Sequence, residues 1–352
     1  GHLTRLLAIA RRMRQLDPEK EIIFYSTSSA MHLILQEGFL GYHFPSKMLF
    51  GEEMTARQWN MLLKEQLDTI LNLHQPKMLV FDGAYPYAGL VASLGDVGHP
   101  MTKVWVKRGL PKPGTENQRQ EKEVLFDQVI VPGEAGQWLT FEEKYKTYVP
   151  PVIYLDRSEL LDRNQVRRQW NIPEGAKLVY VQLGAGNIND IGSTLGMVVD
   201  ALLKREDVFV ILAESIIGKR FHLTRDRVMT LRDYPNSLYF GAFDLAITAS
   251  GYNTFHELMY FGVPSIFIPN EKTKTDDQVA RAKLAVDRGA ALMLLEKDVA
   301  SFDHLLAQAL HHEANGKMRE AAQSLVQENG ADQVARILLE ALPAQKTDGP
   351  KA

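Results

Sequence analysis

The sequence predicts an α/β protein built from two doubly wound, Rossmann-like domains with parallel sheets. Short apolar runs of strand length alternate with amphipathic helical segments along most of the chain, which is the pattern of a parallel sheet covered by helices. The 352 residues, 45% of them apolar, suffice for two domains of ordinary size. A Val-Pro-Pro stretch at residues 149–151 breaks the alternation and is the expected hinge. We therefore expect domains at residues 1–150 and 151–342, followed by a disordered polar tail at 343–352.

The first half is predicted to open with a helix, because apolar residues recur at helical spacing from Leu3 to Leu16, with arginines on the other face. A doubly wound domain normally begins with a buried strand and a Gly-rich loop before such a helix. Neither precedes Gly1, so we expect the numbering to begin inside such a loop, with the first strand missing. The further elements expected here are strands at residues 22–25, 78–81, 103–106 and 128–131, and helices at 31–36, 55–73 and 87–94.

The second half continues the alternation. The elements expected are strands at residues 178–183, 208–212, 238–240, 245–248, 265–268 and 292–295, and helices at 158–170, 195–204, 254–261, 277–287, 300–311, 316–328 and 330–342. Only residues 241–244 separate two of these strands, whereas adjacent parallel strands need a crossover of a dozen or more residues. We therefore expect residues to be missing from the numbering near Gly241.

Composition excludes several classes of protein. The net charge of −3 gives no broad basic surface for nucleic acid. The absence of cysteine excludes disulfides, thiolate metal sites and a cysteine nucleophile, and fits a reducing compartment. No apolar run reaches the roughly 18 residues of a membrane-spanning helix.

The stretch from residue 242 to residue 291 is predicted to carry the main binding site. It has the order strand, Gly turn, helix, strand. Backbone N–H groups at a helix start lack intrahelical partners, and a glycine lets an anion approach them closely. The turn and helix start are therefore a candidate diphosphate cradle, with the residues Ser250, Gly251, Asn253 and Thr254. Glu257, one turn further on, is positioned to accept hydrogen bonds from a ribose, but Thr254 and Glu257 also have the spacing of a capping box that only closes the helix end.

Other residues are candidates for the same ligand. A glycine loop follows the strand at 178–183, where doubly wound sheets bind ligands, and contains Gly184, Ala185, Gly186 and Asn187; a plain tight turn is the alternative. Asp277 and Gln278 are candidates to bind sugar hydroxyls, although aspartate also favours the first position of a helix. Arg157 is a candidate diphosphate contact or else a surface cation. Asp276 and Asp277 lack the spaced oxygen ligands that Mg²⁺ demands, so no metal site is predicted.

This stretch resembles the donor-binding half of GT-B glycosyltransferases of the family 28 type, a group that includes the peptidoglycan-precursor N-acetylglucosaminyltransferase and the galactolipid synthases. The motifs that carry the resemblance, in chain order, are Phe243-Asp244, Ser250-Gly251, Glu257, Gly262-Val263-Pro264 and Asp276-Asp277-Gln278. The resemblance implies a GT-B fold, in which two Rossmann-like domains face each other across a cleft and the last helix crosses back to the first domain. It also implies a nucleotide sugar, UDP-linked, in the C-terminal domain, an acceptor in the N-terminal domain, and no metal or other cofactor.

The expected activity is hexosyl transfer to an unidentified acceptor hydroxyl, with the acceptor lipid-linked or membrane-associated and the enzyme cytoplasmic and peripheral to the membrane. Residues 47–50 are a candidate acceptor-facing or membrane-facing patch. His2 matches a Gly-His position in the first loop of the resembled family and is the candidate general base, since a neutral imidazole suits proton removal near pH 7. A purely positional role for His2 is the alternative, with Asp82 the next candidate base. A nucleotide-sugar epimerase or hydrolase of the same fold, and a non-catalytic nucleotide-sugar-binding subunit, remain as alternative functions.

Overall fold

The computed structural model describes residues 1–107, 121–135, 146–184, 191–214, 225–273 and 276–343. Their strands form three sheets, and every strand pair is parallel within these ranges. The strands of the first half are β1 (Ile23–Ser26), β2 (Leu40–His43), β3 (Met78–Asp82), β4 (Thr102–Val106), β5 (Gln128–Pro132) and β6 (Lys146–Val149). Those of the second half are β7 (Lys177–Gln182), β8 (Val208–Ala213), β9 (Val228–Leu231), β10 (Leu245–Thr248), β11 (Ser265–Phe267) and β12 (Ala291–Met293). The sheet orders are β1-β2, β3-β4-β5-β6 and β12-β11-β10-β7-β8-β9.

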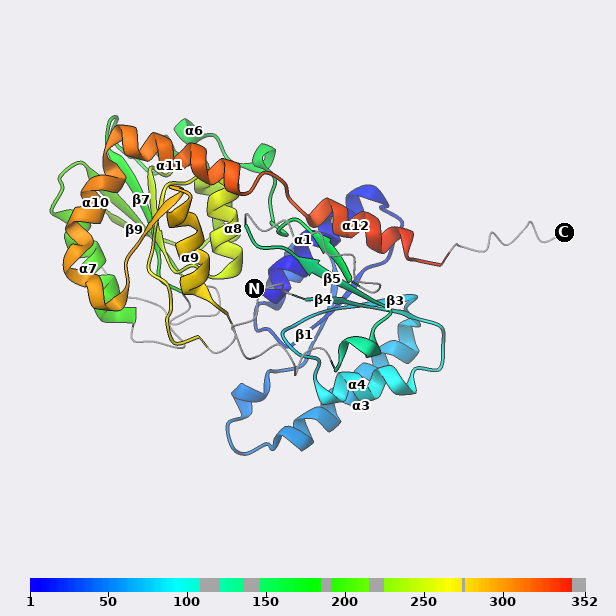
Figure 1. The fold of residues 1–352 in the computed structure, drawn as a ribbon. Coiled ribbons are helices and arrows are strands. Elements are labelled where there is room, and N and C mark those ends of the chain that lie inside the picture. Colours follow the sequence, from blue (N-terminus) through cyan, green and yellow to red (C-terminus); the bar gives the residue numbers. More distant parts are fainter. Residues whose placement is uncertain (108–120, 136–145, 185–190, 215–224, 274–275, 344–352) are drawn as a thin grey trace.

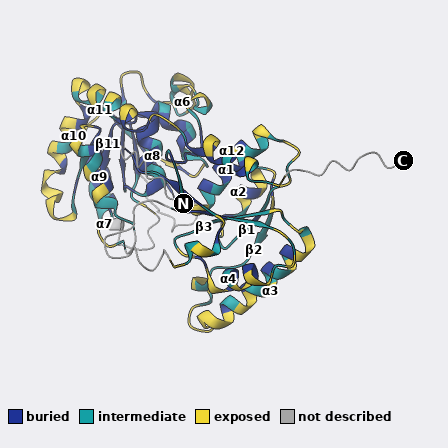
Figure 2. Cartoon of the chain, turned by 45° about the vertical axis from the view of Figure 1, so that its right-hand side comes forward, coloured by how far each residue is buried: buried dark blue, intermediate teal, exposed yellow. Residues whose placement is uncertain are grey.

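Helices cover these sheets (Figure 1). The α-helices are α1 (His2–Leu16), α2 (Met31–Gln36), α3 (Ala56–His74), α4 (Ala88–Asp96), α6 (Arg163–Gln169), α7 (Ile191–Leu203), α8 (Tyr252–Phe261), α9 (Gln278–Asp287), α10 (Phe302–Leu310), α11 (His312–Leu325) and α12 (Ala331–Glu340). The short 3₁₀ helices are η1 (Lys47–Phe50), η2 (Glu123–Leu125), η3 (Arg157–Glu159), η4 (Asn236–Ala242) and η5 (Glu296–Ser301). Figure 2 shows buried residues concentrated in the strands and the inward faces of the helices, while α3 turns an exposed face outward.

The last helix returns to the first half of the chain, as the resemblance implies. α12 packs along α1, and the two lie side by side in Figure 1. Val334 and Leu338 of α12 are fully buried, as is Leu7 of α1, and all three belong to one apolar core that also includes Tyr180 and Phe243 of the second half. The core is therefore continuous between the two halves.

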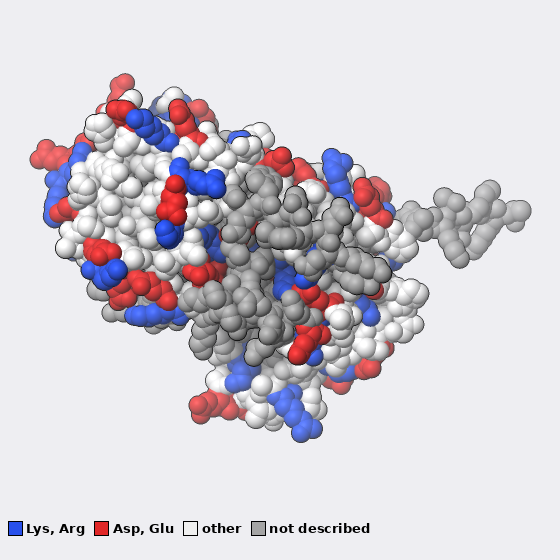
Figure 3. Space-filling model, viewed as in Figure 1, with Lys and Arg blue, Asp and Glu red and all other residues white. Residues whose placement is uncertain are grey.

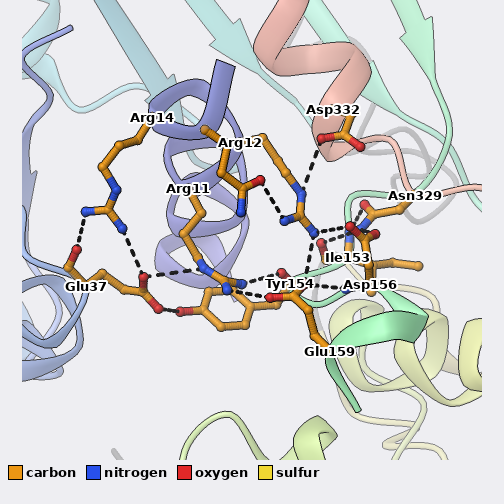
Figure 4. A network of polar contacts seen from close by, with 11 residues as sticks. Arg11, Arg12, Arg14, Glu37, Ile153, Tyr154, Asp156, Glu159, Asn329 and Asp332 are labelled. Carbon is orange, nitrogen blue, oxygen red and sulfur yellow. Dashed lines mark hydrogen bonds and ion pairs between the residues drawn. The ribbon is translucent and has the colours of Figure 1, made fainter. Parts of the chain in front are cut away.

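The hinge stretch after β6 is held by arginines of α1 (Figure 4). Arg11 donates to the Tyr154 carbonyl at 3.0 Å and to Glu159 at 2.6 Å. Arg12 pairs with Asp156 at 2.6 Å. From the other side, Asn329 just before α12 exchanges hydrogen bonds of 3.0 Å with the backbone N–H and carbonyl of Ile153. The hinge is thus fixed between the first helix and the segment that leads into the last one.

The structure corrects the predicted elements around Gly241. Residues 238–240 are not a strand but part of the 3₁₀ helix η4, whose end carries a hydrogen bond from the Phe243 N–H to the Phe240 carbonyl. The strand that precedes β10 is β9, which the sequence analysis did not predict, and β9 lies at the sheet edge with β8 and β7 between it and β10. Residues 232–244 therefore supply the whole connection, so the expectation of missing residues near Gly241 is wrong.

Two further differences concern the region around the hinge. β6 was not predicted as a strand, and the helix expected at residues 158–170 is two short helices, η3 and α6. Asp162 explains the break, because its side chain accepts from the Gln165 N–H at 2.8 Å and starts α6 as an N-cap.

The surface carries no dominant sign of charge on the face shown in Figure 3, where lysines and arginines are interspersed with acidic side chains. Among the residues described, none of the helices combines the length and apolar character that crossing a membrane requires.

Candidate active site

The predicted binding turn joins β10 to α8. Ser250 is buried, Gly251 is the N-cap, and α8 starts at Tyr252 without a side-chain cap on its first N–H groups. Thr254 therefore lies inside the first turn rather than at the cap, so the alternative in which Thr254 and Glu257 form a capping box is wrong. Gly262 ends the helix at φ +68°, a left-handed conformation that favours glycine.

The Glu257 carboxyl faces η4 instead of its own helix end. Its Oε1 accepts a hydrogen bond from the Ser237 hydroxyl at 3.3 Å. Burial raises the pKa of Glu257 to about 7, although the Ser237 hydrogen bond lowers it. The carboxyl can accept a hydrogen bond from a ligand hydroxyl.

The start of α9 lies against the same turn. The Ser250 hydroxyl donates to the Gln278 carbonyl at 2.7 Å, and the Gln278 side chain accepts from the Asn270 N–H at 3.0 Å. Asp277 is the N-cap of α9 and accepts from the Ala280 N–H at 3.0 Å, which confirms the helix-capping alternative for this residue. The amino ends of α8 and α9 thus meet at the carboxyl edge of the sheet.

The glycine loop after β7 begins at this edge too. β7 pairs with β10, and the Ala249 N–H donates to the Gln182 carbonyl at 3.1 Å, so Gly184 follows a strand next to the turn. Gly184 has φ +100°, which a residue with a side chain rarely adopts. The other candidates of this loop, Ala185, Gly186 and Asn187, lie outside the described residues.

Arg157 is not brought to the turn. Its guanidinium donates to the Tyr260 carbonyl at 3.1 Å and to the Val326 carbonyl at 3.3 Å, and it lies over the Tyr260 ring at 4.4 Å. These contacts are at the carboxyl end of α8, whereas the turn is at its amino end. Arg157 therefore joins α8 to the segment after α11.

His2 lies at the start of α1 and pairs with Asp82 at the end of β3. The His2 Nδ1 is 2.5 Å from the Asp82 Oδ1. The Asp82 side chain is fully buried, whereas that of His2 is 46% exposed. The Arg5 Nη2 also lies 3.0 Å from the His2 Nδ1. In the tautomer whose Nδ1 proton is directed at the Asp82 carboxylate, Nε2 carries the lone pair that can accept a proton.

Arg5 completes this group and was not anticipated as a site residue. Its Nε and Nη2 donate to the two Asp82 oxygens at 2.8 and 2.6 Å. Burial alone raises the pKa of Asp82, but the Arg5 charge and the His2 hydrogen bond outweigh burial and hold that pKa below its usual value. Asp82 is therefore an ionised partner of His2, which argues against its use as the base itself.

The two groups of candidate residues meet where the halves of the chain touch. The Asn253 side-chain amide donates to the Gly1 carbonyl at 3.2 Å, so the amino ends of α8 and α1 are in contact. The Arg5 guanidinium also lies over the Tyr252 ring, 5.2 Å from its centre. His2 and Asp82 consequently lie beside the turn that was predicted to bind a diphosphate.

Comparison with known proteins finds a family model that matches part of the second half. Residues 224–337 match the model of the glycosyltransferase family 28 C-terminal domain. The chain contains a glycosyltransferase family 28 C-terminal domain. This family 28 domain includes Ser250, Gly251, Glu257 and Gln278, whereas Gly184 and the His2–Asp82 pair lie outside the matched residues.

Relatives extend the likeness to nearly the whole chain. The UDP-N-acetylglucosamine--N-acetylmuramyl-(pentapeptide) pyrophosphoryl-undecaprenol N-acetylglucosamine transferase of Salinibacter ruber is 24% identical over 96% of this chain and 93% of its own length. The transferase of the same name from Acetivibrio thermocellus is 24% identical over 85% and 83%.

Solved structures show the same fold. The spinosyn forosaminyltransferase SpnP matches with a TM-score of 0.69 at 15% identity, covering 97% of this chain and 96% of its own. Acinetobacter baumannii MurG matches with a TM-score of 0.63 at 15% identity over 97% and 96%. These matches show the GT-B fold that the sequence resemblance implied.

The described residues offer no cluster of three or more His, Asp or Glu side chains arranged to hold a metal ion.

Proposed function

We propose that this enzyme transfers a hexose from a UDP-sugar to an acceptor hydroxyl without a metal ion. The observation that carries the proposal is the contact between the amino ends of α1 and α8. Because of this contact, the His2–Asp82 pair lies beside the start of α8, which has no side-chain N-cap. One element suits proton removal from an acceptor, and the other suits a leaving diphosphate.

On the donor side, the diphosphate binds at the turn from Ser250 to Thr254. The N–H groups at the start of α8, which carry no side-chain cap, and the positive end of the α8 dipole attract it. Gly251 leaves room for it, since no atom of the described residues beyond its chain neighbours lies within 4 Å of the position of a Cβ. Glu257 binds the ribose hydroxyls, and Gln278, one helix away, faces the donor sugar. Gly184 contributes to the same ligand.

On the acceptor side, His2 is the general base. The acceptor O–H gives its proton to the His2 Nε2 as its oxygen bonds to the anomeric carbon, and the bond from that carbon to the diphosphate oxygen breaks. Asp82 holds the ring and stabilises the imidazolium that forms, and Arg5 fixes Asp82. The negative charge that develops on the diphosphate is stabilised at the start of α8.

The acceptor is lipid-linked, and the enzyme is peripheral to a membrane on its cytoplasmic side. The transferases named above act on an undecaprenol-linked acceptor, which supports this part of the proposal. The first half also exposes large apolar side chains near one another in sequence: Met48 is 87% exposed, Leu49 69% and Met61 58%.

The test begins with thermal shift over a panel of nucleotides and nucleotide sugars, since a ligand that binds only the folded state raises apparent stability. UDP and one UDP-sugar are expected to give the largest shifts. Glu257→Ala is then expected to weaken UDP binding by about 1–3 kcal/mol in calorimetric titration, because ribose hydrogen bonds are lost.

Glu313→Ala is the matched control, because Glu313 is an exposed residue of α11 whose partner is Lys317. Equal UDP affinity for Glu257→Ala and Glu313→Ala would refute the ribose role. Turnover of the UDP-sugar without any acceptor would instead favour an epimerase or a hydrolase, and binding without turnover on any acceptor would favour a non-catalytic subunit.

A further inference from the structure

A buried ion pair joins the two halves of the chain next to the donor turn. Glu134 follows β5 of the first half, and Arg281 lies in α9 of the second. The Arg281 Nε and Nη2 donate to the two Glu134 oxygens, each at 2.7 Å, and both side chains are 2% exposed. This bidentate geometry is the strong form of an arginine–carboxylate contact.

The same guanidinium also holds both segments of the donor turn. The Arg281 Nη1 donates to the Ser250 carbonyl at 2.9 Å, immediately before the N-cap of α8. Its Nη2 pairs with Asp276 at 2.9 Å, immediately before the N-cap of α9. One side chain thus sets the separation of the two helix starts that face the predicted ligand.

Residues on either side of Glu134 contact the first turns of α8. The Tyr252 hydroxyl donates to the Gly133 carbonyl at 2.9 Å. The Ala135 N–H donates to the His256 Nε2 at 3.1 Å, and His256 is itself hydrogen-bonded through Nδ1 to the Tyr252 carbonyl at 2.7 Å. The Glu134 Oε2 lies 3.3 Å from the same His256 Nε2. Each of residues 133–135 therefore contacts the first turns of α8.

These contacts make the shape of the turn depend on the other half. Two desolvated charges are stable only while each has its partner, and removing one partner leaves the other uncompensated. If Glu134 is lost, Arg281 keeps Asp276 but loses its bidentate anchor, and the Ser250 carbonyl loses a fixed donor. The turn then samples more conformations, and only a fraction of them accept a diphosphate.

We propose that Glu134 is a positioning residue that fixes the donor turn through Arg281, so that the first half of the chain completes the nucleotide site of the second. This inference rests on the proposed function for the identity of the ligand. Glu134 itself touches no substrate. Its effect is on the population of the binding-competent turn, and the apparent affinity falls in proportion to that population.

The experiment compares wild type with Glu134→Gln, which keeps the shape but turns one acceptor into a donor facing the guanidinium. UDP affinity by calorimetry is expected to fall by about 10-fold or more, within the usual range of coupling between sites. Hydrogen exchange of the amides at residues 250–256, measured without ligand, is expected to speed up. Glu134→Asp, which keeps the charge, is expected to recover part of both effects.

Asp303→Asn is the matched control, because it makes the same chemical change in an ion pair with Lys204 whose side chains are both 65% exposed. It is expected to leave UDP affinity and exchange unchanged. If Glu134→Gln fails to fold, Tyr252→Phe replaces it, since that variant removes only the hydroxyl that reaches Gly133 and is expected to shift both readouts in the same direction.

The inference is overturned if the folded variant binds UDP as tightly as wild type, or if its amides at 250–256 exchange as slowly. Wild type that binds no nucleotide refutes the proposed function and the ligand part of this inference. In that case, faster exchange in Glu134→Gln would still support the coupling of the turn to the first half. A failure of the proposed function is therefore distinguishable from a failure of this inference.

Discussion

Acidification should destabilise this protein through His256, which packs at the junction of the two halves. The ring is fully buried, and both of its nitrogens are used by the neutral form, Nδ1 towards the Tyr252 carbonyl and Nε2 as the acceptor from the Ala135 N–H. A proton on Nε2 breaks the second hydrogen bond. Burial lowers the pKa of His256 to about 4, with Glu134 raising it and Arg281 lowering it.

The sign and size of the effect follow from linkage. An unfolded histidine has a pKa near 6.5, so between pH 6.5 and pH 4 the unfolded chain binds a proton that the folded chain does not. Stability therefore falls as the pH is lowered through this window and is fully present above it. A difference of about 2.5 pKa units corresponds to about 3 kcal/mol over the whole window.

Urea unfolding at about pH 7 and about pH 4.5 measures the change in the free energy of unfolding. Wild type is compared with His256→Gln, because the titration of the carboxyl groups contributes equally to both and cancels. The variant should be less stable than wild type at neutral pH but should lose less stability on acidification. His304→Gln, at an exposed position of α10, serves as the control and should follow wild type. Parallel loss of stability in wild type and His256→Gln would refute the reasoning.

Two further predictions concern catalysis. Activity should persist after treatment with EDTA, because backbone N–H groups at the start of α8 stabilise the leaving diphosphate; loss of turnover that Mg²⁺ or Mn²⁺ restores would contradict this. His2→Ala should lower kcat by about 10²- to 10⁴-fold at saturating donor while UDP binding is retained, because a general base is lost. A variant with near-wild-type kcat would assign the base to another residue.

Much of the fold was predictable because its periodic signals are local. α2 and β10 fall on their predicted residues, since a short apolar run bounded by turn residues identifies each. The same signal misled at residues 238–240, where Leu238, Tyr239 and Phe240 have the apolar character of a strand but lie in a 3₁₀ helix. Periodicity over three residues cannot distinguish the two. β9 was missed although three of its four residues, Val228, Met229 and Leu231, are apolar.

The candidate site was predictable in its glycines and polar turn, but its charged partners were not. Arg5 and Arg12 were expected on the outer face of α1 with the other arginines, yet both are buried. Their partners come from residues far along the chain, and Glu134 lies 147 residues before Arg281. The spacing of residues in a single sequence does not predict such a pair. An arginine on the same helix face as apolar leucines does indicate a buried guanidinium, which needs a carboxylate partner from elsewhere in the chain.

The return of α12 to α1 has a consequence for exchanging the first half of the chain between proteins of this fold. A chimera with one junction at the hinge would join a foreign first half to an α12 whose Val334 and Leu338 are shaped for the α1 of this chain. The crossing is also tight, since a Cβ on Gly330 would lie 2.1 Å from the Pro150 carbonyl oxygen. A transplantable first half is therefore discontinuous in sequence, and needs one junction in the hinge and a second just before α12.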